Sequence, residues 1–259
     1  MFKNFLPYLI ALIALWLSAC STTKDASEAY QNETPNQIYS EGVKALRKGD
    51  YSEATKRFEA LEVQYPLGNN TETSQLYIIY AYYNKEEYVM ASAAADRFIR
   101  TYSANPYVDY AYYMRGLADF YQNMGFLERA FSIDLAERDL TPIKKTYTDF
   151  SELTERFPES PYTPAAHQYL VYLRNILAKH ELNIANYYYI RKAYVASANR
   201  ASEVVKHYQG AEYIPDALVL MVKSYRQLHL ELPEQQAMAV LEYNFPQYTK
   251  SNSILDISS

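Results

Sequence analysis

The chain has 259 residues, and its 25 Lys and Arg against 30 Asp and Glu give a formal net charge of −5, which argues against nucleic acid as a partner. Its length allows one large domain or an elongated repeat array. A single cysteine excludes an internal disulfide, so the fold must be stabilised by packing.

The N-terminal residues have the pattern of a bacterial export signal. One positive charge in Met1–Asn4 precedes the apolar run Phe5–Leu17. That run is too short for a transmembrane helix, which needs about 20 apolar residues. The string Leu17-Ser18-Ala19-Cys20 resembles the lipobox of bacterial lipoproteins, although a lone cysteine can also end a signal peptide by chance. We therefore predict a signal peptide over residues 1–19.

The resemblance to a lipobox implies a covalent lipid on Cys20, with N-acyl and S-diacylglycerol groups, and no other cofactor is expected. Each buried CH₂ contributes about 0.8 kcal/mol, so several acyl chains together form a stable anchor. Ser21 after the cysteine resembles the sorting signal of Gram-negative lipoproteins that reach the outer membrane. We expect a protein that is anchored by lipid at the periplasmic face of the cell outer membrane. Residues 20–35 are polar and are predicted to form a flexible tether.

Beyond Pro35 the apolar residues recur at helical spacing, and no alternating strand pattern of useful length appears, which predicts an all-α chain. The string Gly49-Asp50-Tyr51 begins a pattern typical of a helical hairpin. Gly49 allows the chain to turn out of one helix, and the next residues place a small and a large side chain on one face of the second helix. These residues are Ala54, Phe58 and Leu61, and Pro66 is expected to close that helix.

The same order of small and large residues returns further along the chain. It resembles the tetratricopeptide repeat (TPR), in which two antiparallel helices occupy about 34 residues. We predict an α-solenoid of about five TPR repeats over residues 36–248, with N-terminal repeats in 36–140 and C-terminal repeats in 141–248, and a polar tail over 249–259. The repeated sets are Tyr88, Ala91, Ala95 and Phe98; Thr146, Phe150, Leu153 and Pro158; Tyr194, Ser197, Ala201 and Val204; and a weaker copy at Ala237 and Leu241.

The spacing between equivalent positions predicts two insertions, because the separations are 37, 55, 51 and 40 residues. The first insertion lies around residues 120–139 and is predicted to be a protruding loop with some helix. The second lengthens a helix over Pro164–Lys192, for which Thr163 is the expected N-cap. The positions taken as equivalent are Ala54, Ala91, Thr146, Ser197 and Ala237.

The sequence lacks the motifs that most catalytic or metal sites need. Its four histidines are scattered, and no pair is spaced three or four residues apart as a helical metal site requires. The phosphate-binding string G-x-x-x-x-G-K-[ST], the nucleophile elbow G-x-S-x-G and the string C-x-x-C are absent. We therefore expect neither an enzyme nor a metal protein.

The 29 tyrosines form clusters along the helical pattern. Most are expected to be core residues whose hydroxyl reaches water or a carbonyl group. Neighbouring residues of a helix cannot all face inward, so the run Tyr187-Tyr188-Tyr189 must expose at least one ring. Exposed Tyr beside Arg is common at interface hot spots. Arg97 and Arg100 flank Phe98 in this way, although they fit equally well as ordinary solvated arginines.

Several strings resemble the BamD family of lipoproteins, also called competence lipoprotein ComL, of the outer-membrane β-barrel assembly machinery. The resemblance extends from the lipobox to the fifth repeat and is looser in the insertion, at Gly125–Glu128 and Ser132–Leu135. It implies a scaffold of five repeats without enzymatic activity. The matching strings are Asn36-Gln37-Ile38-Tyr39, Ala60-Leu61 through Tyr65-Pro66, Tyr80-Ala81-Tyr82-Tyr83, Asp96-Arg97-Phe98-Ile99-Arg100, Asp109-Tyr110, Tyr113-Met114-Arg115-Gly116-Leu117, Phe150-Ser151-Glu152-Leu153, Leu177-Ala178-Lys179 and Tyr187-Tyr188.

The resemblance also implies partners and binding residues. In this family the N-terminal repeats receive the C-terminal targeting signal of unfolded outer-membrane proteins. The C-terminal repeats dock on the barrel subunit BamA, beside other lipoproteins of the complex. A nascent strand that ends in an aromatic residue and a carboxylate is matched chemically by Tyr and Arg. The residues carried over are Tyr65, Arg97 and Arg100 for the targeting signal and Tyr187, Tyr188 and Arg200 for BamA.

We therefore expect a non-catalytic assembly factor that binds BamA and unfolded β-barrel precursors and promotes their insertion into the outer membrane. A periplasmic TPR lipoprotein that recruits peptidoglycan hydrolases is the main alternative, because the repeats by themselves fit both roles. An enzyme is the third reading, and it would need a cleft with perturbed titratable groups.

Overall fold

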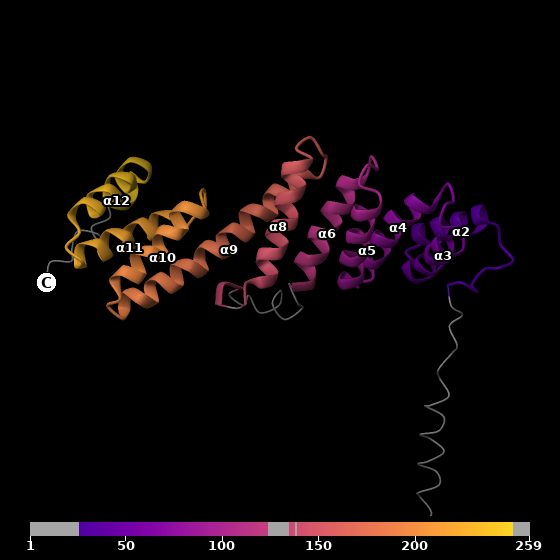
Figure 1. Ribbon diagram of the computed structural model, residues 1–259, viewed down its shortest axis with the longest axis horizontal. Helices are drawn as coiled ribbons and strands as arrows, with labels where there is room; N and C mark the ends of the chain where they lie inside the picture. The colour runs from indigo at the N-terminus through magenta and orange to yellow at the C-terminus, as the bar shows by residue number, and fades with distance from the viewer. Residues whose placement is uncertain (1–25, 124–134, 138, 251–259) are drawn as a thin grey trace, which may run out of the picture. The chain divides into compact units, whose positions relative to one another are not determined.

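The computed structural model describes residues 26–123, 135–137 and 139–250 (Figure 1). All regular elements among these residues are helices, so the predicted all-α fold is confirmed. None of the helices in these ranges is both long and apolar enough to cross a membrane. The predicted signal peptide, Cys20 and the tail from Ser251 lie outside the described residues.

The chain forms two compact units, residues 1–85 and 86–259. The first unit holds α2 (Pro35–Arg47), α3 (Tyr51–Gln64) and α4 (Thr71–Asn84). Helix α3 packs against both α2 and α4. The first predicted hairpin is therefore present as α2 and α3.

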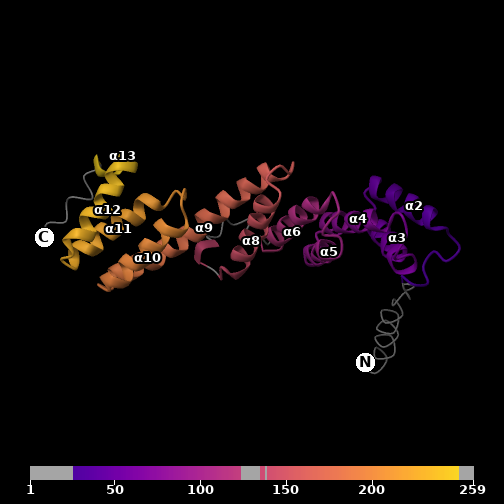
Figure 2. The same cartoon turned by 45° about the horizontal axis from the view of Figure 1, so that its top comes forward.

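In the second unit each described α-helix packs against the next described α-helix in the chain. Its elements are α5 (Tyr88–Thr101), α6 (Val108–Asn123), η1 (Leu135–Glu137), α8 (Thr141–Arg156), α9 (Thr163–Ile190), α10 (Tyr194–His207), α11 (Ile214–Gln227), α12 (Glu231–Asn244) and α13 (Pro246–Lys250). Consecutive α-helices from α5 to α13 are in contact, and α9 also contacts η1 and α11. Figures 1 and 2 show α9 beside α8 at one end and beside α10 at the other. Such sequential packing is typical of helical repeat proteins. The predicted groups 36–140 and 141–248 differ from the two compact units and stay a prediction.

A residue in the left-handed backbone region precedes α3, α5, α10 and α12 by two positions. Gly49 has φ +76°, as the hairpin pattern predicted, because glycine has no Cβ to clash there. Glu86, Lys192 and His229 take the same conformation with φ of 60°, 61° and 56°. A residue with a Cβ is strained there by about 1 to 3 kcal/mol. The packing of the helices on either side must offset that strain.

An aromatic residue caps the C-terminal end of α3, α5, α8, α10 and α12. Its backbone N–H donates to the carbonyl four residues earlier, at 2.8 to 3.1 Å. This recurring cap ends each of these helices in the same way. The five caps are Tyr65, Tyr102, Phe157, Tyr208 and Phe245.

The long helix predicted over Pro164–Lys192 is present as α9, which has 28 residues. The prediction that Thr163 is its N-cap is wrong. Tyr162 occupies that position, and the Thr163 hydroxyl donates to the Phe157 carbonyl at 2.7 Å. The hydroxyl therefore fixes the loop before α9 and does not cap the helix.

Burial confirms the predicted register of the first four repeats. Twelve of the residues that the pattern placed on the inner face of a second helix are at most 2 % exposed, whereas Tyr88 and Tyr194 are half-buried. Buried alanine or serine leaves room for the neighbouring helix, and buried phenylalanine or leucine fills the space between the pair. The residues concerned are Ala54, Phe58, Leu61, Ala91, Ala95, Phe98, Thr146, Phe150, Leu153, Ser197, Ala201 and Val204.

The position predicted for the fifth repeat, Ala237, is wrong by three residues. In the other repeats the equivalent position lies eleven residues before the aromatic cap, as Ser197 does before Tyr208. Counting back from Phe245 gives Glu234, which follows Ser197 by 37 residues, the separation found between the first two repeats. Ala237 fits the sequence pattern because it is small and buried. At the equivalent position itself, the Glu234 carboxylate pairs with an arginine of α11 at 2.8 Å.

Two glycines allow paired helices to approach closely. A Cβ on Gly42 of α2 would lie 2.7 Å from the Phe58 ring of α3. A Cβ on Gly116 of α6 would lie 2.7 Å from the Phe150 ring of α8. Both rings are fully buried. The close approach of these paired helices therefore depends on a glycine in the first helix as well as on the small buried residues of the second helix.

A buried arginine joins three helices of the second unit. Arg115 of α6 is 9 % exposed, and its guanidinium lies 2.9 Å from Asp96 of α5. On α8 it lies 2.9 Å from Asp149 and 2.5 Å from Glu152. One guanidinium can serve several carboxylates because it carries five N–H donors. Arg115 thus pairs with acidic residues of both helices that pack against α6.

The same network contains two carboxyl groups with opposite pKa shifts. Burial raises the pKa of Asp149 to about 7, and the hydrogen bond to Asp119 adds to this rise. The positive charges of Arg115 and Lys145 oppose the rise without cancelling it. Burial would also raise the pKa of Asp119, but hydrogen bonds from Asp149, Lys145 and Ser92 outweigh it and lower that pKa. Below about pH 7, Asp149 therefore holds a proton and donates it in a hydrogen bond to the Asp119 carboxylate.

Part of the predicted tether lies on the first repeat. Residues 26–33 form turns that contact α3 through hydrogen bonds and ion pairs. Thr34 then starts α2 with a capping box, in which the Thr34 hydroxyl and the Gln37 side chain each bond the backbone amide of the other. The predicted segment 20–35 thus includes residues that are packed on a helix.

We predict that Gly116→Ala destabilises the second unit. In an exposed helix this change stabilises by roughly 1 kcal/mol. Here the new Cβ would press on Phe150, whose ring is stacked 4.8 Å from Tyr169, and overpacking costs about 1 to 3 kcal/mol. Urea denaturation should show a lower free energy of unfolding, and the loss should shrink in a Phe150→Leu background. A stabilised single variant would contradict the close approach.

We predict that Asp149 makes the fold less stable as the pH rises from about 4 to 7. In this window the folded chain holds the Asp149 proton and the unfolded chain has released it, so the free energy of unfolding falls with rising pH. Asp149→Asn keeps a donor for Asp119 and removes this titration. In urea denaturation from pH 4.5 to 7.5, the free energy of unfolding of the variant should therefore rise increasingly relative to that of the wild type. Glu155→Gln, an exposed change on the same helix, is the control and should show the same pH dependence as the wild type. If the free energy of unfolding of Asp149→Asn differed from that of the wild type by the same amount at every pH, the shared proton would be contradicted.

Candidate functional site

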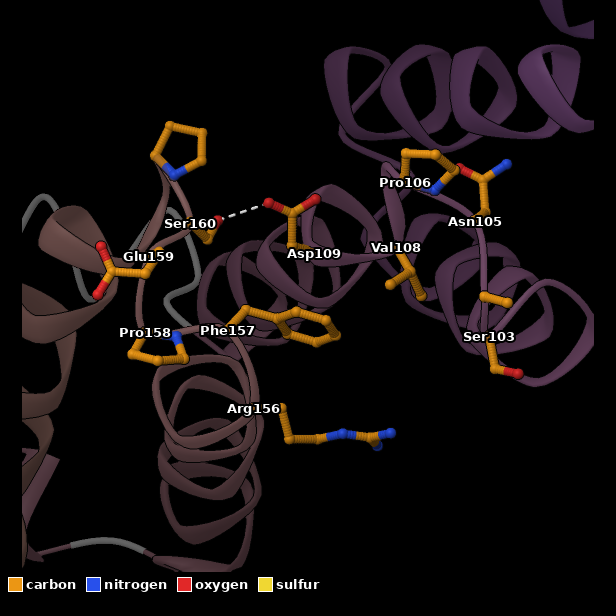
Figure 3. Close-up of a pocket in the computed structure, with 12 residues that line it drawn as sticks. Ser103, Asn105, Pro106, Val108, Asp109, Arg156, Phe157, Pro158, Glu159 and Ser160 are labelled. Carbon is orange, nitrogen blue, oxygen red and sulfur yellow. Dashed lines mark hydrogen bonds between the residues drawn. The ribbon is translucent and has the colours of Figure 1, made fainter.

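A cavity of about 510 Å³ opens between two loops of the second unit (Figure 3). One wall is the loop from α5 to α6, residues 102–107, and the other is the loop from α8 to α9, residues 157–162. The Phe157 ring points from its own loop toward the other one. Prolines stiffen both walls because each fixes its own φ. These prolines are Pro106, Pro158 and Pro161.

Several polar groups of this cavity have partners within the chain. Ser160 donates to Asp109 at 2.7 Å, drawn as the dashed line in Figure 3. The Arg156 guanidinium contacts the Tyr112 hydroxyl and lies 5.2 Å from the centre of that ring. The lining includes no His, Cys or Lys. Such a cavity fits an apolar side chain of a ligand better than a chemical reaction.

The three residues predicted to bind a targeting signal lie in different units. Tyr65 ends α3 in the first unit, and its carbonyl accepts from the Thr71 hydroxyl at 2.8 Å. Tyr65 is one of the five aromatic caps, so its role in ending α3 is enough to explain a tyrosine at this position. Arg97 and Arg100 are exposed on α5 of the second unit, three residues apart and on one face of the helix, and Arg100 lies 3.6 Å from Asp96. Binding of a signal by these residues stays a prediction.

The residues predicted to face BamA lie on α9 and α10, which pack against each other. Tyr187 and Tyr188 occupy the last turn of α9, with ring centres 5.7 Å apart, and Tyr187 is 54 % exposed. Arg200 of α10 pairs with Glu181 of α9, with Nη1 2.9 Å from Oε2. Arg200 therefore has a partner within the chain that the sequence did not reveal. Its side chain is still 45 % exposed.

Three further exposed residues extend this surface, and the sequence analysis missed them. The Arg191 guanidinium lies 5.0 Å from the centre of the Tyr187 ring. Its position four residues after Tyr187 is the signal that could have found it, because residues four apart share a helix face. Ile190 and Val195 are 80 % and 59 % exposed on either side of the turn between α9 and α10. We call Tyr187, Tyr188, Ile190, Arg191 and Val195 the α9–α10 turn patch.

Among the described residues, the predicted partner-binding positions include exposed side chains, and no group of side chains is arranged as a reaction centre. In this part of the chain no three His, Cys, Asp or Glu side chains are placed to hold a metal ion. Asp119 and Asp149, whose pKa values shift in opposite directions, are held by each other and by Arg115 and Lys145. Ion-pair networks that join helices perturb pKa values in this way. An exposed patch of Tyr, Arg and aliphatic side chains is instead the chemistry of a protein interface.

Comparison with known proteins agrees with this reading. The family model YfiO, described as "Outer membrane lipoprotein", matches residues 31–241. The "Outer membrane protein assembly factor BamD" of Neisseria meningitidis is 37 % identical over 238 residues, which cover 90 % of this chain and 89 % of the relative. The protein of the same name from Vibrio cholerae is 34 % identical over 237 residues, which cover 91 % and 97 %.

A solved tetratricopeptide repeat protein from Parabacteroides merdae aligns with 83 % of this chain and 96 % of its own, at 13 % identity and a TM-score of 0.32. The family match begins in the turns before α2 and ends within α12. The chain therefore belongs to the YfiO family of outer membrane lipoproteins, and curated relatives that span nearly its whole length are named outer membrane protein assembly factor BamD.

Proposed function

We propose that the chain is a non-catalytic lipoprotein component of the machinery that assembles β-barrels in the outer membrane. The observation that carries this proposal is the similarity to assembly factors over about nine tenths of the chain, at 31 to 37 % identity. The proposed location is the periplasmic face of the outer membrane, with a lipid on Cys20 as the anchor. The proposed partners are BamA, other lipoproteins of the complex and unfolded outer-membrane proteins.

The α9–α10 turn patch supports a protein partner such as BamA. An exposed tyrosine stacked under an arginine offers a rigid aromatic surface with a positive charge, and exposed Ile190 and Val195 border it. Aromatic and arginine side chains contribute most at the centres of protein interfaces. Arg200 can join such an interface while its other side stays bound to Glu181.

Arg97 and Arg100 support the proposed contact with a targeting signal. Both are exposed on one face of α5, so their guanidinium groups can approach one ligand. A C-terminal carboxylate is a suitable ligand because it accepts paired N–H donors from arginine. The exposed pair of Arg100 with Asp96, at 3.6 Å, is weak enough to be exchanged for such a ligand.

An adaptor that recruits peptidoglycan hydrolases is not supported, because the matching relatives are named assembly factors. Affinity purification separates the two roles. The tagged full chain, solubilised with detergent from the outer membrane, should recover BamA together with other lipoproteins of the complex. A tagged, unrelated lipoprotein of the same membrane is the control, because it shows which proteins are recovered only by sharing a detergent micelle. Recovery of a cell-wall hydrolase without any β-barrel protein would refute the proposal.

We predict that the two binding surfaces act separately. Replacing Arg97 and Arg100 by Glu should weaken binding of a peptide ending in Phe by about tenfold or more, because charge reversal repels the carboxylate, and should spare BamA. Tyr187→Ala with Arg200→Glu should do the reverse. Titration calorimetry with the peptide and with the isolated periplasmic domain of BamA measures both affinities.

Two controls accompany this prediction. Lys206→Glu reverses an exposed charge elsewhere on α10 and should change neither affinity. Thermal melts of all variants show whether the helices remain folded. Equal losses of both affinities in a folded variant would show one shared surface, and the separation of roles would then be abandoned.

A further inference from the structure

The segment before α2 is fixed to α3 around one arginine. Arg57 of α3 lies 4.2 Å from the centre of the Tyr30 ring and pairs with Glu33 at 2.8 Å. The Tyr30 hydroxyl donates to Glu53 at 3.0 Å, and Glu53 pairs with Arg57 at 2.7 Å. Burial raises the pKa of Tyr30 to about 12, and the hydrogen bond to Glu53 adds to this, so the hydroxyl keeps its proton at neutral pH. We call residues 26–33 the strap.

Gln64 holds the start of the strap at the C-terminal end of α3. Its Nε2 donates to the carbonyls of Ala26 and Ala29, at 2.9 and 2.6 Å. Tyr30, with φ +58°, turns the chain from there along the helix. Cys20 precedes Ala26 by six residues, so the two lie at most about 20 Å apart. A lipid on Cys20 therefore keeps this end of α3 close to the bilayer into which the lipid inserts.

Two apolar side chains beside Gln64 are exposed to solvent. Leu67, in the loop after α3, is 98 % exposed, and Val63 in the last turn of α3 is 55 % exposed. Single exposed apolar residues are common on soluble proteins. These two, however, lie at the end of the helix to which the strap is fixed. The other end of α3 begins with exposed, polar Ser52 beside its cap.

We propose that Val63 and Leu67 contact the lipid surface and that the strap holds them there. The inference rests on the proposed acylation of Cys20. The short distance from the lipid to the strap favours a bilayer over a protein ligand as the occupant of this surface. Two side chains suffice because the lipid anchor makes their contact with the bilayer intramolecular, at a high effective concentration. The strap thereby orients the first repeat relative to the membrane.

Fluorescence quenching in vesicles tests this contact. The acylated full chain is reconstituted into vesicles of phosphatidylethanolamine and phosphatidylglycerol that contain a lipid with a nitroxide quencher. With Cys20 acylated, an introduced cysteine carries the single fluorophore, at Asn69→Cys beside Leu67 or at Ser52→Cys as the matched control. Ser52 lies about 18 Å from Gln64 along α3. The label at Asn69 should be quenched severalfold more strongly than the label at Ser52.

Two sets of variants assign the cause. Val63→Ser with Leu67→Ser, and separately Tyr30→Ala with Gln64→Ala, should each reduce quenching at position 69 to the level of the Ser52 control. Both variants should still float with the vesicles, because the acyl chains are intact. Thermal melts should show that α3 stays folded, since its core residues Phe58 and Leu61 are unchanged.

The outcomes separate this inference from the anchor on which it rests. If the wild-type chain does not float with vesicles, the acylation proposal fails and the lipid contact fails with it. If the chain floats but both labels are quenched alike, the anchor stands and the contact is refuted. Protection of the label at Asn69 only after addition of BamA or of a peptide ending in Phe would assign Val63 and Leu67 to a protein ligand. Unchanged quenching in the Tyr30→Ala, Gln64→Ala variant would refute the role of the strap.

Discussion

The close approach of paired helices is the constraint on which the rest of the structure depends. Gly42 faces Phe58 and Gly116 faces Phe150 in the same way, although the second pair is separated by the insertion around residues 120–139. Lengthening a loop raises its closure entropy only slowly, so the insertion can be accommodated without loss of the contact. The glycine and the buried ring therefore define the hairpin, and the connection between them is free to vary.

The buried charges add a second constraint in the second unit. A slip of α5, α6 or α8 would separate the buried Arg115 guanidinium from Asp96, Asp149 or Glu152, and an unpaired buried charge is costly. The network thus distinguishes the correct crossing from neighbouring ones that would pack apolar residues nearly as well. Its titratable groups are occupied in joining helices.

The surfaces proposed for partners lie outside the packed core of the repeats. Most aromatic side chains are used between helices, as the Phe150 ring is against Tyr169, or as helix caps. The α9–α10 turn patch lies at a turn, the exposed arginines lie on the outer face of α5, and the strap lies before the first repeat. Binding residues can therefore vary without disturbing the stacked core.

The sequence by itself determined the helical class, the hairpins and the core of the first four repeats. Ala54 and Phe58 are four residues apart, and that spacing alone places both on one helix face, whatever surrounds them. The predicted lipobox and the family strings are likewise short runs of neighbouring residues, so they can be recognised from the sequence alone. The same local reading failed at Ala237, because a small buried residue three positions from the true equivalent satisfies the pattern equally well.

The tertiary structure decided what depends on residues far apart in the chain. Lys192 adopts a left-handed backbone conformation because the helices on either side fix the turn. A lysine in the sequence does not predict that conformation. Arg200 pairs with Glu181, and Gln64 holds the strap, through contacts that span 19 and 35 to 38 residues. A sequence pattern reports the face on which a side chain lies, but only folding decides which distant group meets it there.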